Sequence, residues 1–370
     1  MVSNNSTPRY KPIFTPLGDS SNSCTIDDEV SSFRLVSYNI LAQSYVKSAY
    51  FPHSPSPCLR WKVRSKALLE RLLSFEADIL CLQELDEFES FFKGQLDSHG
   101  YSSIYVKRPG KKKDGCGIFY RSSRLSLVES AVIQYNDLVP QSGESNVDPS
   151  TFAVVASSND DSSGDDPDRG DPNDPRIRLK RDCVGIIAAF RVSHALDSTF
   201  VIANTHIYWD PDWVDVKLAQ AKHLVARVSS FQSLLSSKLC IKIPVVICGD
   251  FNSTPGDQVY SYLTSADQSV LDDATASSAD QGCLPLHSLY ASMKEEPHFT
   301  NCTPDFTGTL DYIFFSSFDT LKPVSLLEVP FAESEDVKGG LPNYNHPSDH
   351  LPIGTDCMIW GPKEPRNMAL

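Results

Sequence analysis

The chain has 370 residues, of which 41% are hydrophobic and 22% charged, a composition usual for a soluble globular protein. Its 47 acidic and 33 basic residues give a formal net charge of −14, which argues against non-specific binding of duplex nucleic acid through a basic surface. An anionic substrate would therefore need a local positive charge, such as a metal ion. No apolar run approaches the ~20 residues of a membrane span, so we expect a protein that does not cross a bilayer.

The ten cysteines are scattered without a C-x₂-C pair, and Cys81 and Cys248 lie inside strand-like apolar runs. Such cysteines are typical of buried, reduced thiols in an intracellular protein, and they do not predict a zinc site. We expect a cytoplasmic protein, with the nucleus also open. Arg9 and Lys11 precede the first acid, Asp19, so organelle targeting by the N-terminal segment stays open.

Composition along the chain predicts one folded domain over residues 31–360. Residues 1–30 are rich in Ser, Asn, Thr and Pro and should form a mobile tail, and residues 361–370 should form a second one. Residues 157–176 are acidic and rich in Pro and Gly, which predicts a disordered insertion between strands.

Hydrophobic periodicity then predicts alternating strands and helices, which is the order of an α/β fold. The expected strands cover residues 34–41, 77–84, 114–120, 183–190, 199–204, 243–247 and 310–315. The expected helices cover residues 61–75, 87–99 and 213–235. In the first of these helices, apolar residues recur on one face, as in an amphipathic helix packed on a sheet.

The stretch 248–255 follows the apolar strand 243–247 and carries Asp250 and Asn252 on a turn closed by Pro255. Side chains two residues apart in an extended segment point to the same side, so both can enter one site. A carboxylate and an amide held at a strand end suit the activation of a water beside a developing oxyanion. Ordinary Asx-turn chemistry at a strand end is the alternative.

Other polar residues also lie at or beside the ends of apolar strands. The full set is Asn39, Glu84, His206, Asp250, Asn252, Asp311, Asp349 and His350. Each one alone could be a cap, a surface carboxylate or a satisfied core histidine. Strand interiors rarely take Asp or Asn, and α/β folds build their sites at strand ends, so the eight together predict an active site.

Six motifs in order resemble the motif set of the endonuclease/exonuclease/phosphatase superfamily over about residues 33–356. They are SYNIL, LCLQEL, NTHIYWDP, CGDFNSTP, LDYIFF and SDHLPI. Within it, NTHIYWDP, HFTNCTPDFTGTLDYIFF and NHPSDHLP are similar to the carbon catabolite repressor type poly(A)-specific 3′-exoribonucleases and their relative nocturnin. The leucine-rich repeats of the founding deadenylase are missing from the sequence. We therefore expect no docking through such repeats to a larger complex. We also expect a monomer.

The resemblance implies a four-layer α/β sandwich, in which two packed mixed β-sheets are flanked by helices and the site lies at one end. It also implies Mg²⁺, or Mn²⁺ in its place, because a phosphodiester resists attack until its oxygens are neutralised by a hard cation. Glu84 would be the main metal ligand, with Asn39 close to the same ion. Asp349 would support the metal or its waters.

The resemblance assigns the other polar residues to the reaction. Asp250 would orient and deprotonate the attacking water, and Asn252 would hold the nucleophile or a phosphate oxygen. His206 and His350 would bond phosphoryl oxygens. Asp311 would pair with a histidine and fix its tautomer.

Substrate recognition is expected at a second group of residues. The resemblance places Pro211 and Phe306 on either side of an adenine, where stacking is worth about 1–3 kcal/mol per base. Core packing is the alternative for Phe306. Further substrate-binding residues are expected to be Asn204, Lys107 and Arg108.

The sequence therefore predicts a Mg²⁺-dependent 3′-exoribonuclease that shortens poly(A) tails of mRNA and releases 5′-AMP. One alternative is a nocturnin-like phosphatase that removes the 2′-phosphate of NADP(H). In nocturnin basic residues follow the THL motif, whereas Tyr208 and Asp210 occupy those positions here. An alternative of another class is a catalytically silent RNA-binding scaffold, which would require losses among the eight polar positions, and none is lost.

Overall fold

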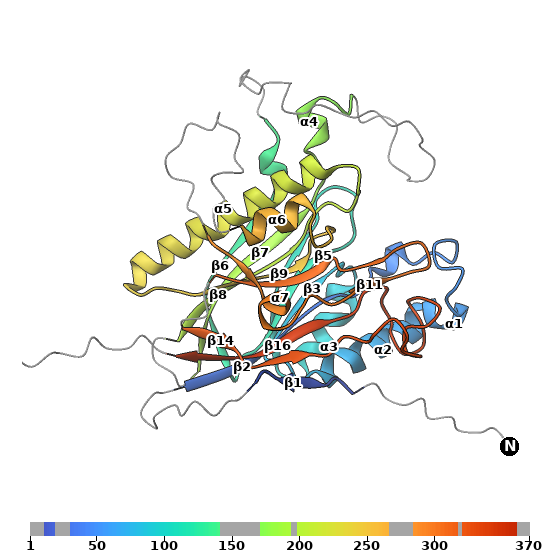
Figure 1. The fold of residues 1–370 in the computed structure, drawn as a ribbon, viewed down its shortest axis with the longest axis horizontal. Coiled ribbons are helices and arrows are strands. Elements are labelled where there is room, and N and C mark those ends of the chain that lie inside the picture. The colour runs from blue at the N-terminus through green and yellow to red at the C-terminus, as the bar shows by residue number, and fades with distance from the viewer. Residues whose placement is uncertain are drawn as a thin grey trace, which may run out of the picture.

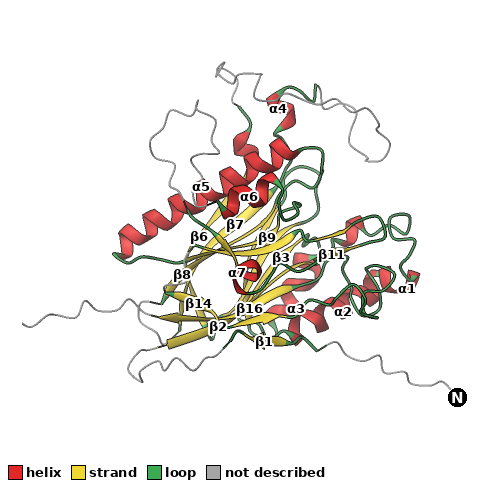
Figure 2. Cartoon of the chain, viewed as in Figure 1, coloured by secondary structure: helices red, strands yellow, loops and turns green. Residues whose placement is uncertain are grey.

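Two six-stranded β-sheets pack face to face, and helices cover both outer faces (Figures 1 and 2). The computed structural model describes residues 11–18, 30–140, 171–193, 198–265, 284–316 and 320–360. The predicted four-layer α/β sandwich is confirmed by this arrangement of helices, sheet, sheet and helices. None of the helices in the described residues is long and apolar enough to span a membrane.

The first sheet contains the strands that precede and follow the first predicted helix. In spatial order it consists of β14 (Leu321–Pro323), β16 (Ile353–Trp360), β2 (Val30–Asn39), β3 (Ile79–Gln83), β5 (Gly115–Arg121) and β4 (Tyr101–Lys107). β2 and β3 are parallel, with Asn39 opposite Gln83, and the other neighbouring strands are antiparallel. The C-terminal ends of β2 and β3 therefore meet at one edge of the sheet.

The second sheet repeats this plan around another parallel pair. In spatial order it consists of β10 (His287–Ser288), β13 (Asp311–Phe315), β9 (Val245–Asp250), β8 (Thr199–His206), β7 (Val184–Val192) and β6 (Leu125–Gln134). β8 and β9 are parallel, with His206 opposite Asp250. β13 runs antiparallel to β9, so its first residue, Asp311, also lies opposite Asp250.

Alternation along the buried strands explains the layers. In β8, Phe200 and Ile202 face the other sheet, whereas Val201 and Ala203 face the outer helices. Successive side chains of a strand point to opposite faces, so a strand that is apolar throughout is buried on both. Full burial of each Val, Ile or Phe side chain stabilises the fold by about 1.5–3 kcal/mol.

The helices form the two outer layers. α5 (Val214–Leu239) and α6 (Gln258–Thr264) cover the second sheet, and α2 (Trp61–Ser74) and α3 (Lys93–Asp97) cover the first (Figure 1). The shorter helices are η1 (Gln43–Tyr45), α1 (Ser56–Leu59), η2 (Phe88–Phe92), η3 (Tyr135–Leu138), α4 (Pro175–Arg178) and α7 (Leu289–Met293). Two small ribbons pair β1 (Phe14–Pro16) with β15 (Ser325–Leu327), and β11 (Asn301–Cys302) with β12 (Thr307–Gly308).

The helix predicted over residues 87–99 is divided in two. Its first part, η2, is a π turn, and its second part is α3. The carbonyl of Glu87 accepts hydrogen bonds from the N–H groups of both Phe91, at 3.0 Å, and Phe92, at 3.1 Å. The bond to Phe92 spans five residues, which widens the turn and interrupts the α-helical pattern.

The expected N-terminal tail also differs from the structure. Residues 14–16 form β1 and pair with β15, and the N–H of Leu17 donates to the carbonyl of Val324 at 2.9 Å. Of the expected insertion, residues 157–170 lie outside the described residues, and residues 171–176 lead into α4. Asp174 caps that helix through the N–H of Arg176 at 2.9 Å. The expected tail at 361–370 lies outside the described residues.

Candidate active site

The predicted polar residues meet where the ends of the two sheets come together. Asn39 is the last residue of β2, and Glu84 follows β3 directly. His206 and Asp250 end the parallel strands β8 and β9, and Asp311 begins β13 beside them. The hydrogen bond from Asn39 Nδ2 to Asp250 Oδ2, at 2.9 Å, joins the first sheet to the second at this point.

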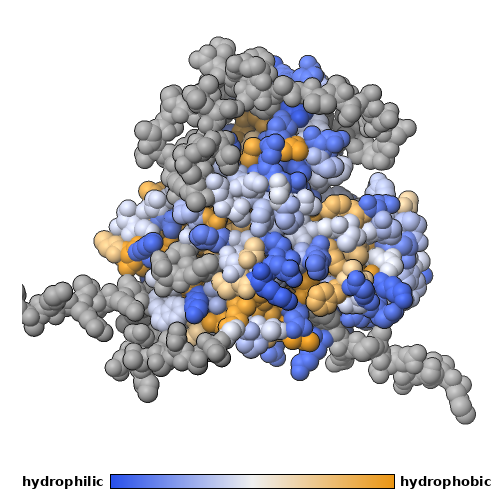
Figure 3. Space-filling view, viewed as in Figure 1, coloured by the Kyte–Doolittle hydropathy of each residue, from blue (hydrophilic) through white to orange (hydrophobic). Residues whose placement is uncertain are grey.

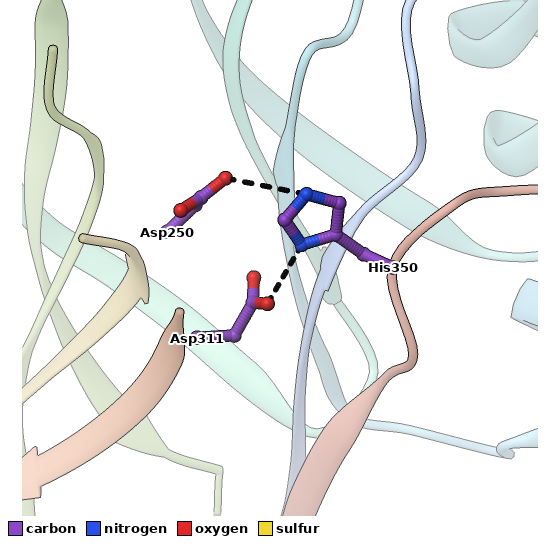
Figure 4. Close-up of side chains that lie close together, drawn as sticks. All are labelled: Asp250, Asp311 and His350. Atoms are coloured by element: carbon purple, nitrogen blue, oxygen red, sulfur yellow. Dashed lines mark hydrogen bonds and ion pairs between the residues drawn. The ribbon is translucent and has the colours of Figure 1, made fainter. Parts of the chain in front are cut away.

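His350 lies between two carboxylates of the second sheet (Figure 4). Its Nδ1 lies 2.7 Å from Asp311 Oδ2, and its Nε2 lies 3.6 Å from Asp250 Oδ2. A carboxylate accepts a hydrogen bond, so Asp311 holds the proton on Nδ1 and orients the ring. All three side chains are buried, and His350 reaches them from the segment that precedes β16.

The charges around His350 favour its imidazolium form. Burial alone would lower the pKa of His350, but the carboxylates of Asp311 and Asp250 outweigh it and raise that pKa well above its usual value. Burial raises the pKa of Asp311, and the neighbouring Asp250 raises it further. The pair can therefore keep a positively charged donor in the site at neutral pH.

Glu84 is held at the mouth of the site by two hydrogen bonds. Its Oε1 accepts from Asn39 Nδ2 and its Oε2 accepts from the N–H of Ala42, both at 3.0 Å. Its backbone is left-handed, with φ of 55°, which costs about 1–3 kcal/mol for a residue other than glycine. Burial raises the pKa of the Glu84 carboxyl, and the nearby Asp349 carboxylate raises it further.

Asn39, which was expected close to the metal ion, is hydrogen-bonded to two carboxylates. Its Nδ2 donates to both Glu84 and Asp250, and its Oδ1 accepts from the N–H of Leu41 at 3.0 Å. Two carboxylates on one side of the carboxamide require the nitrogen there, because oxygen facing oxygen would repel. The side chain therefore connects and orients the two carboxylates.

The remaining carboxylates fit a divalent cation. Ligand atoms of Asp250, Asp311 and His350 lie within 4.8 Å of one another. The short bond joins Asp311 Oδ2 to His350 Nδ1, while Asp311 Oδ1 is buried without a hydrogen-bond partner among the described residues. Glu84 is partly exposed, and Asp349 is half-buried beside it. Burial and the Asp349 carboxylate both raise the pKa of Glu84. Carboxylates are the oxygen donors that Mg²⁺ and Mn²⁺ prefer.

His206 faces the same carboxylate as His350. Its Nε2 lies 3.5 Å from Asp250 Oδ2, and its side chain is 12% exposed. Its buried Nδ1 has no hydrogen-bond partner among the described residues. The ring is thus positioned to contact a bound anion beside Asp250.

Asn252 shapes the turn that carries Asp250. Its N–H donates to Asp250 Oδ1 at 2.9 Å, and its Nδ2 donates to the carbonyl of Ile207 at 3.1 Å. Its backbone is left-handed, with φ of 46°. The carbonyl of Asn252 accepts from Lys217 Nζ at 2.8 Å, a contact that the sequence analysis did not predict.

Two of the expected substrate-binding residues have structural roles instead. Asn204 is fully buried; its Nδ2 donates to the carbonyls of Leu82 and Gly117, and its Oδ1 accepts from Gln83 Nε2 at 2.7 Å. It therefore links the two sheets and cannot reach a substrate.

Arg108 is likewise engaged. Its guanidinium donates to the carbonyls of Asp182, at 2.9 Å, and Arg181, at 3.1 Å, and lies 3.5 Å from Asp114 Oδ2. With an 11% exposed side chain, it joins two loops and is not available to a substrate. Its neighbour Lys107 is exposed at the end of β4.

The two residues expected to clamp a base are accessible. Phe306 is 41% exposed on the turn between β11 and β12, and Pro211 is exposed on the loop after β8. β11 is linked to the catalytic segment, because the N–H of Cys302 donates to the carbonyl of Asp349 at 3.1 Å. A Cβ added to Gly308 would lie 2.8 Å from Phe306 Cζ, so the tip of the ring rests on that glycine.

Arg64 of α2 is a further residue that the sequence analysis missed. It is 1% exposed, and its guanidinium donates to the carbonyls of Ile40, Leu41 and Pro347. It thereby ties the loop after Asn39 to the segment that carries His350. The signal was present in the sequence, because Arg64 lies four residues before Leu68 on the apolar face of its helix.

A separate cavity of about 480 Å³ lies between β1, β15 and α7 and is lined by residues such as Tyr290, Leu326 and Phe331. Figure 3 shows hydrophobic surface on this face near the position of α7 and β16 in Figure 1. None of the predicted site residues lines this cavity. It therefore does not belong to the polar cluster.

Comparison with known proteins relates this geometry to described relatives. A profile of the "Endonuclease/Exonuclease/phosphatase family" matches residues 36–350. "Carbon catabolite repressor protein 4 homolog 4" of Arabidopsis thaliana is 51% identical over 328 residues, which cover 88% of this chain and 78% of the relative. The "CCR4-Not complex 3′-5′-exoribonuclease subunit Ccr4" of Phaeosphaeria nodorum is 29% identical over 383 residues, which cover 89% of this chain but only 60% of that relative.

Solved structures share the fold. The chain matches ANGEL2, titled "a 2′,3′-cyclic phosphatase", with a TM-score of 0.69 and 24% identity, over 95% of this chain and 99% of that one. It matches the human nocturnin catalytic domain with a TM-score of 0.60 and 25% identity, over 95% of this chain and 98% of that one. The predicted resemblance to the superfamily, including its deadenylase and nocturnin branch, is thus confirmed.

Proposed function

Because the chain belongs to the endonuclease/exonuclease/phosphatase family, we propose that it is a divalent-metal-dependent 3′-exoribonuclease that shortens poly(A) tails and releases 5′-AMP. The observation that carries the proposal is the convergence of Asp250, His350 and Asp311 beside Glu84. The fungal relative is named as a 3′-5′-exoribonuclease subunit, which supports RNA as the substrate.

Asp250 is the group proposed to activate water. Its Oδ1 is fixed by the N–H of Asn252, while its Oδ2 faces Asn39, His206 and His350. Oδ2 takes the proton of the attacking water as the new oxygen–phosphorus bond forms. The bond from phosphorus to the 3′-oxygen of the preceding nucleotide breaks, and that oxygen leaves and takes up a proton.

The histidines are proposed to stabilise the charge that develops on the phosphoryl oxygens. His350 keeps a proton on Nδ1 for Asp311, and its raised pKa keeps a second proton on Nε2 to donate. His206 presents Nε2 from the other side of Asp250. Preorganised donors of this kind typically contribute about 10²–10³-fold to the rate.

Glu84 and Asp349 would hold the cation. When bound, Mg²⁺ or Mn²⁺ would supply positive charge that neutralises phosphate oxygens. Burial and the neighbouring Asp349 carboxylate raise the pKa of Glu84, and a cation bound there would offset both effects, which supports this assignment. Asn39 keeps the Glu84 carboxylate beside Asp250.

Adenine recognition is proposed for Pro211 and Phe306. Both are accessible, and β11, which leads to Phe306, is hydrogen-bonded to the Asp349 segment. Stacking of a base on such groups is worth about 1–3 kcal/mol. Lys107, which is exposed at the end of β4, is proposed to contact a phosphate of the RNA.

A nocturnin-like NADP(H) 2′-phosphatase is the second candidate, and the shared fold favours it. That chemistry needs cations near the loop after His206. Tyr208 there is buried, and the carboxylate of Asp210 accepts from the N–H of Asp212 at 3.0 Å. Neither position carries a cation, which favours RNA over a compact dinucleotide, and the guanidinium of Arg181 lies over the ring of Tyr208 at 4.9 Å.

The test is to incubate the purified protein with 5′-labelled oligo(A) or mixed-sequence RNA in Mg²⁺ or EDTA. We expect stepwise shortening of oligo(A) from its 3′ end, release of 5′-AMP, and no reaction in EDTA. Phe306→Ala should raise KM for oligo(A) about 5- to 100-fold, as loss of one stacking contact would, while Phe331→Ala, at an exposed position beside the separate cavity, should not. Internal cleavage products, or full activity in EDTA, would contradict the proposal.

A further inference from the structure

Lys217 is a buried cation beside the candidate active site. It lies in the first turn of α5, is 3% exposed, and donates from Nζ to the carbonyl of Asn252 at 2.8 Å. Asn252 lies two residues after Asp250 in the sequence. Lys217 therefore contacts the turn that carries the proposed base, from the helix that covers its sheet.

The position of Lys217 is unfavourable for a lysine. Burial lowers its pKa, and the carboxylates of Asp257, Asp210 and Asp250 oppose that effect. A cation in the first turn also interacts unfavourably with the positive end of the helix dipole. A residue that breaks local preferences in this way is expected where function requires it.

The hydrogen bonds around Asn252 connect Lys217 to Asp250. Asn252 is left-handed, and its N–H and its carbonyl belong to two successive peptide units whose relative orientation is set by the conformation of this residue. With the carbonyl held by Lys217, the N–H of Asn252 points to Asp250 Oδ1 at 2.9 Å. The N–H of Ile207 donates to the carbonyl of Asp250 at 3.1 Å, and the side chain of Asn252 returns to the carbonyl of Ile207 at 3.1 Å.

This network holds the carboxylate of Asp250 in one orientation. Oδ1 is occupied by the N–H of Asn252, and Oδ2 faces Asn39, His206 and His350. If Asn252 left this conformation, Oδ1 would lose its donor and the carboxylate could turn. Misplacement of a catalytic group by about 1 Å can cost up to about 10²-fold in rate.

We propose that Lys217 is a positioning residue for hydrolysis: its ammonium group fixes the carbonyl of Asn252 and with it the left-handed conformation of that residue, and the N–H of Asn252 fixes the carboxylate of Asp250. The inference rests on the role proposed above for Asp250. Lys217 touches no reacting atom and acts only through Asn252. Its removal should therefore lower kcat and leave substrate binding unchanged.

The test uses three variants of Lys217 and a matched control. Lys217→Met keeps the aliphatic stem without the donor, Lys217→Arg keeps charge and donor, and Lys217→Gln keeps a shorter donor. Lys238→Met is the control, because Lys238 lies exposed in the last turn of the same helix and pairs with Glu129 at 3.0 Å. Each is assayed on oligo(A) with Mg²⁺, together with its melting temperature.

We expect Lys217→Met to lower kcat about 10- to 100-fold with KM almost unchanged. Lys217→Arg should recover part of the lost kcat, and Lys238→Met should behave as wild type. If the Met variant does not fold, the Gln variant takes its place. A variant that folds and keeps kcat within about 3-fold of wild type, well short of the loss expected from a misplaced group, would overturn the proposal.

A double-mutant cycle separates positioning from a purely structural role. If Lys217 acts through Asp250, its substitution should cost little more once Asp250→Asn has removed the base. Fully multiplicative losses would overturn the inference. If wild type hydrolyses NADPH and not oligo(A), the proposed substrate is wrong, and the same cycle on NADPH still tests Lys217.

Discussion

Asp250→Asn is the substitution that tests the proposed base most directly. Both oxygens of Asp250 accept hydrogen bonds from nitrogen donors: Oδ1 from the N–H of Asn252 and Oδ2 from Asn39 Nδ2, each at 2.9 Å. An asparagine has one oxygen and one NH₂ group. In either orientation of the new amide, one N–H group therefore faces another N–H group.

Asp250→Asn should affect both folding stability and catalysis. A buried donor left without an acceptor costs about 1–3 kcal/mol of folding stability, so the melting temperature should fall by a few degrees. Loss of the general base should lower kcat by about 10²–10⁴-fold. As long as the variant remains folded, the expected loss of kcat is therefore too large to result from the loss of stability.

The assay combines single-turnover cleavage of 5′-labelled oligo(A), fluorescence anisotropy for RNA binding, and thermal unfolding. Asp137→Asn, the same substitution at an exposed position of η3, is the control and should match wild type. RNA binding by Asp250→Asn should be retained. A folded variant that turns over within about 10-fold of wild type, less than the smallest loss expected for a general base, would refute Asp250 as the base.

Three further substitutions test other parts of the site. Glu84→Ala should lose both activity and the rise in melting temperature with Mg²⁺. Burial raises the pKa of Glu84, so in EDTA the stability of wild type relative to the variant should fall as pH rises from about 4.3 through that raised pKa, and an unchanged difference would contradict this account. Gly308→Ala should displace the ring of Phe306, because Cζ of that ring would lie 2.8 Å from the new Cβ. KM for oligo(A) should rise with little change in melting temperature, and an unaltered KM would argue against a base clamp. His350→Gln should destabilise the fold most below pH about 6.5, and the loss of stability should shrink as pH rises through the raised pKa of His350. Urea unfolding at several pH values measures this loss, and a loss that grows with pH would exclude this charge pair.

The strand-end residues could be predicted because the sequence shows where the apolar strands lie and in which order they follow one another. Apolar runs identify β2, β3, β8 and β9, and the residues that end them are polar. Each of these pairs is parallel and connected through a helix, so its C-terminal ends meet at one edge. The convergence of Asn39 and Glu84 with Asp250 follows from that topology.

Asn204 shows what the sequence did not reveal. It is two residues before His206 on the same face of β8, so sequence alone gives both residues the same direction. Two residues of a strand span about 6.6 Å, and that distance carries Asn204 below the site into the contact between the sheets. Its partners at Leu82 and Gly117 come from another part of the chain.

Arg108 and Lys217 show the same limit for charged residues. A cation near a motif suggests a substrate contact, but Arg108 binds backbone carbonyls of the segment after α4. Lys217 falls on the apolar face of α5, four residues before Ala221 and seven before Leu224. Its sequence position thus indicated burial, although its partner at Asn252 required the structure.

The ratio of kcat/KM for oligo(A) to kcat/KM for NADPH, measured side by side with Mg²⁺, tests the central claim most directly. The accessible Pro211 and Phe306, and the absence of a cationic side chain at Tyr208 and Asp210, predict that oligo(A) is the better substrate. Phe306→Ala should lower the ratio, because it removes a base contact and no metal ligand. A higher kcat/KM for NADPH would contradict the account.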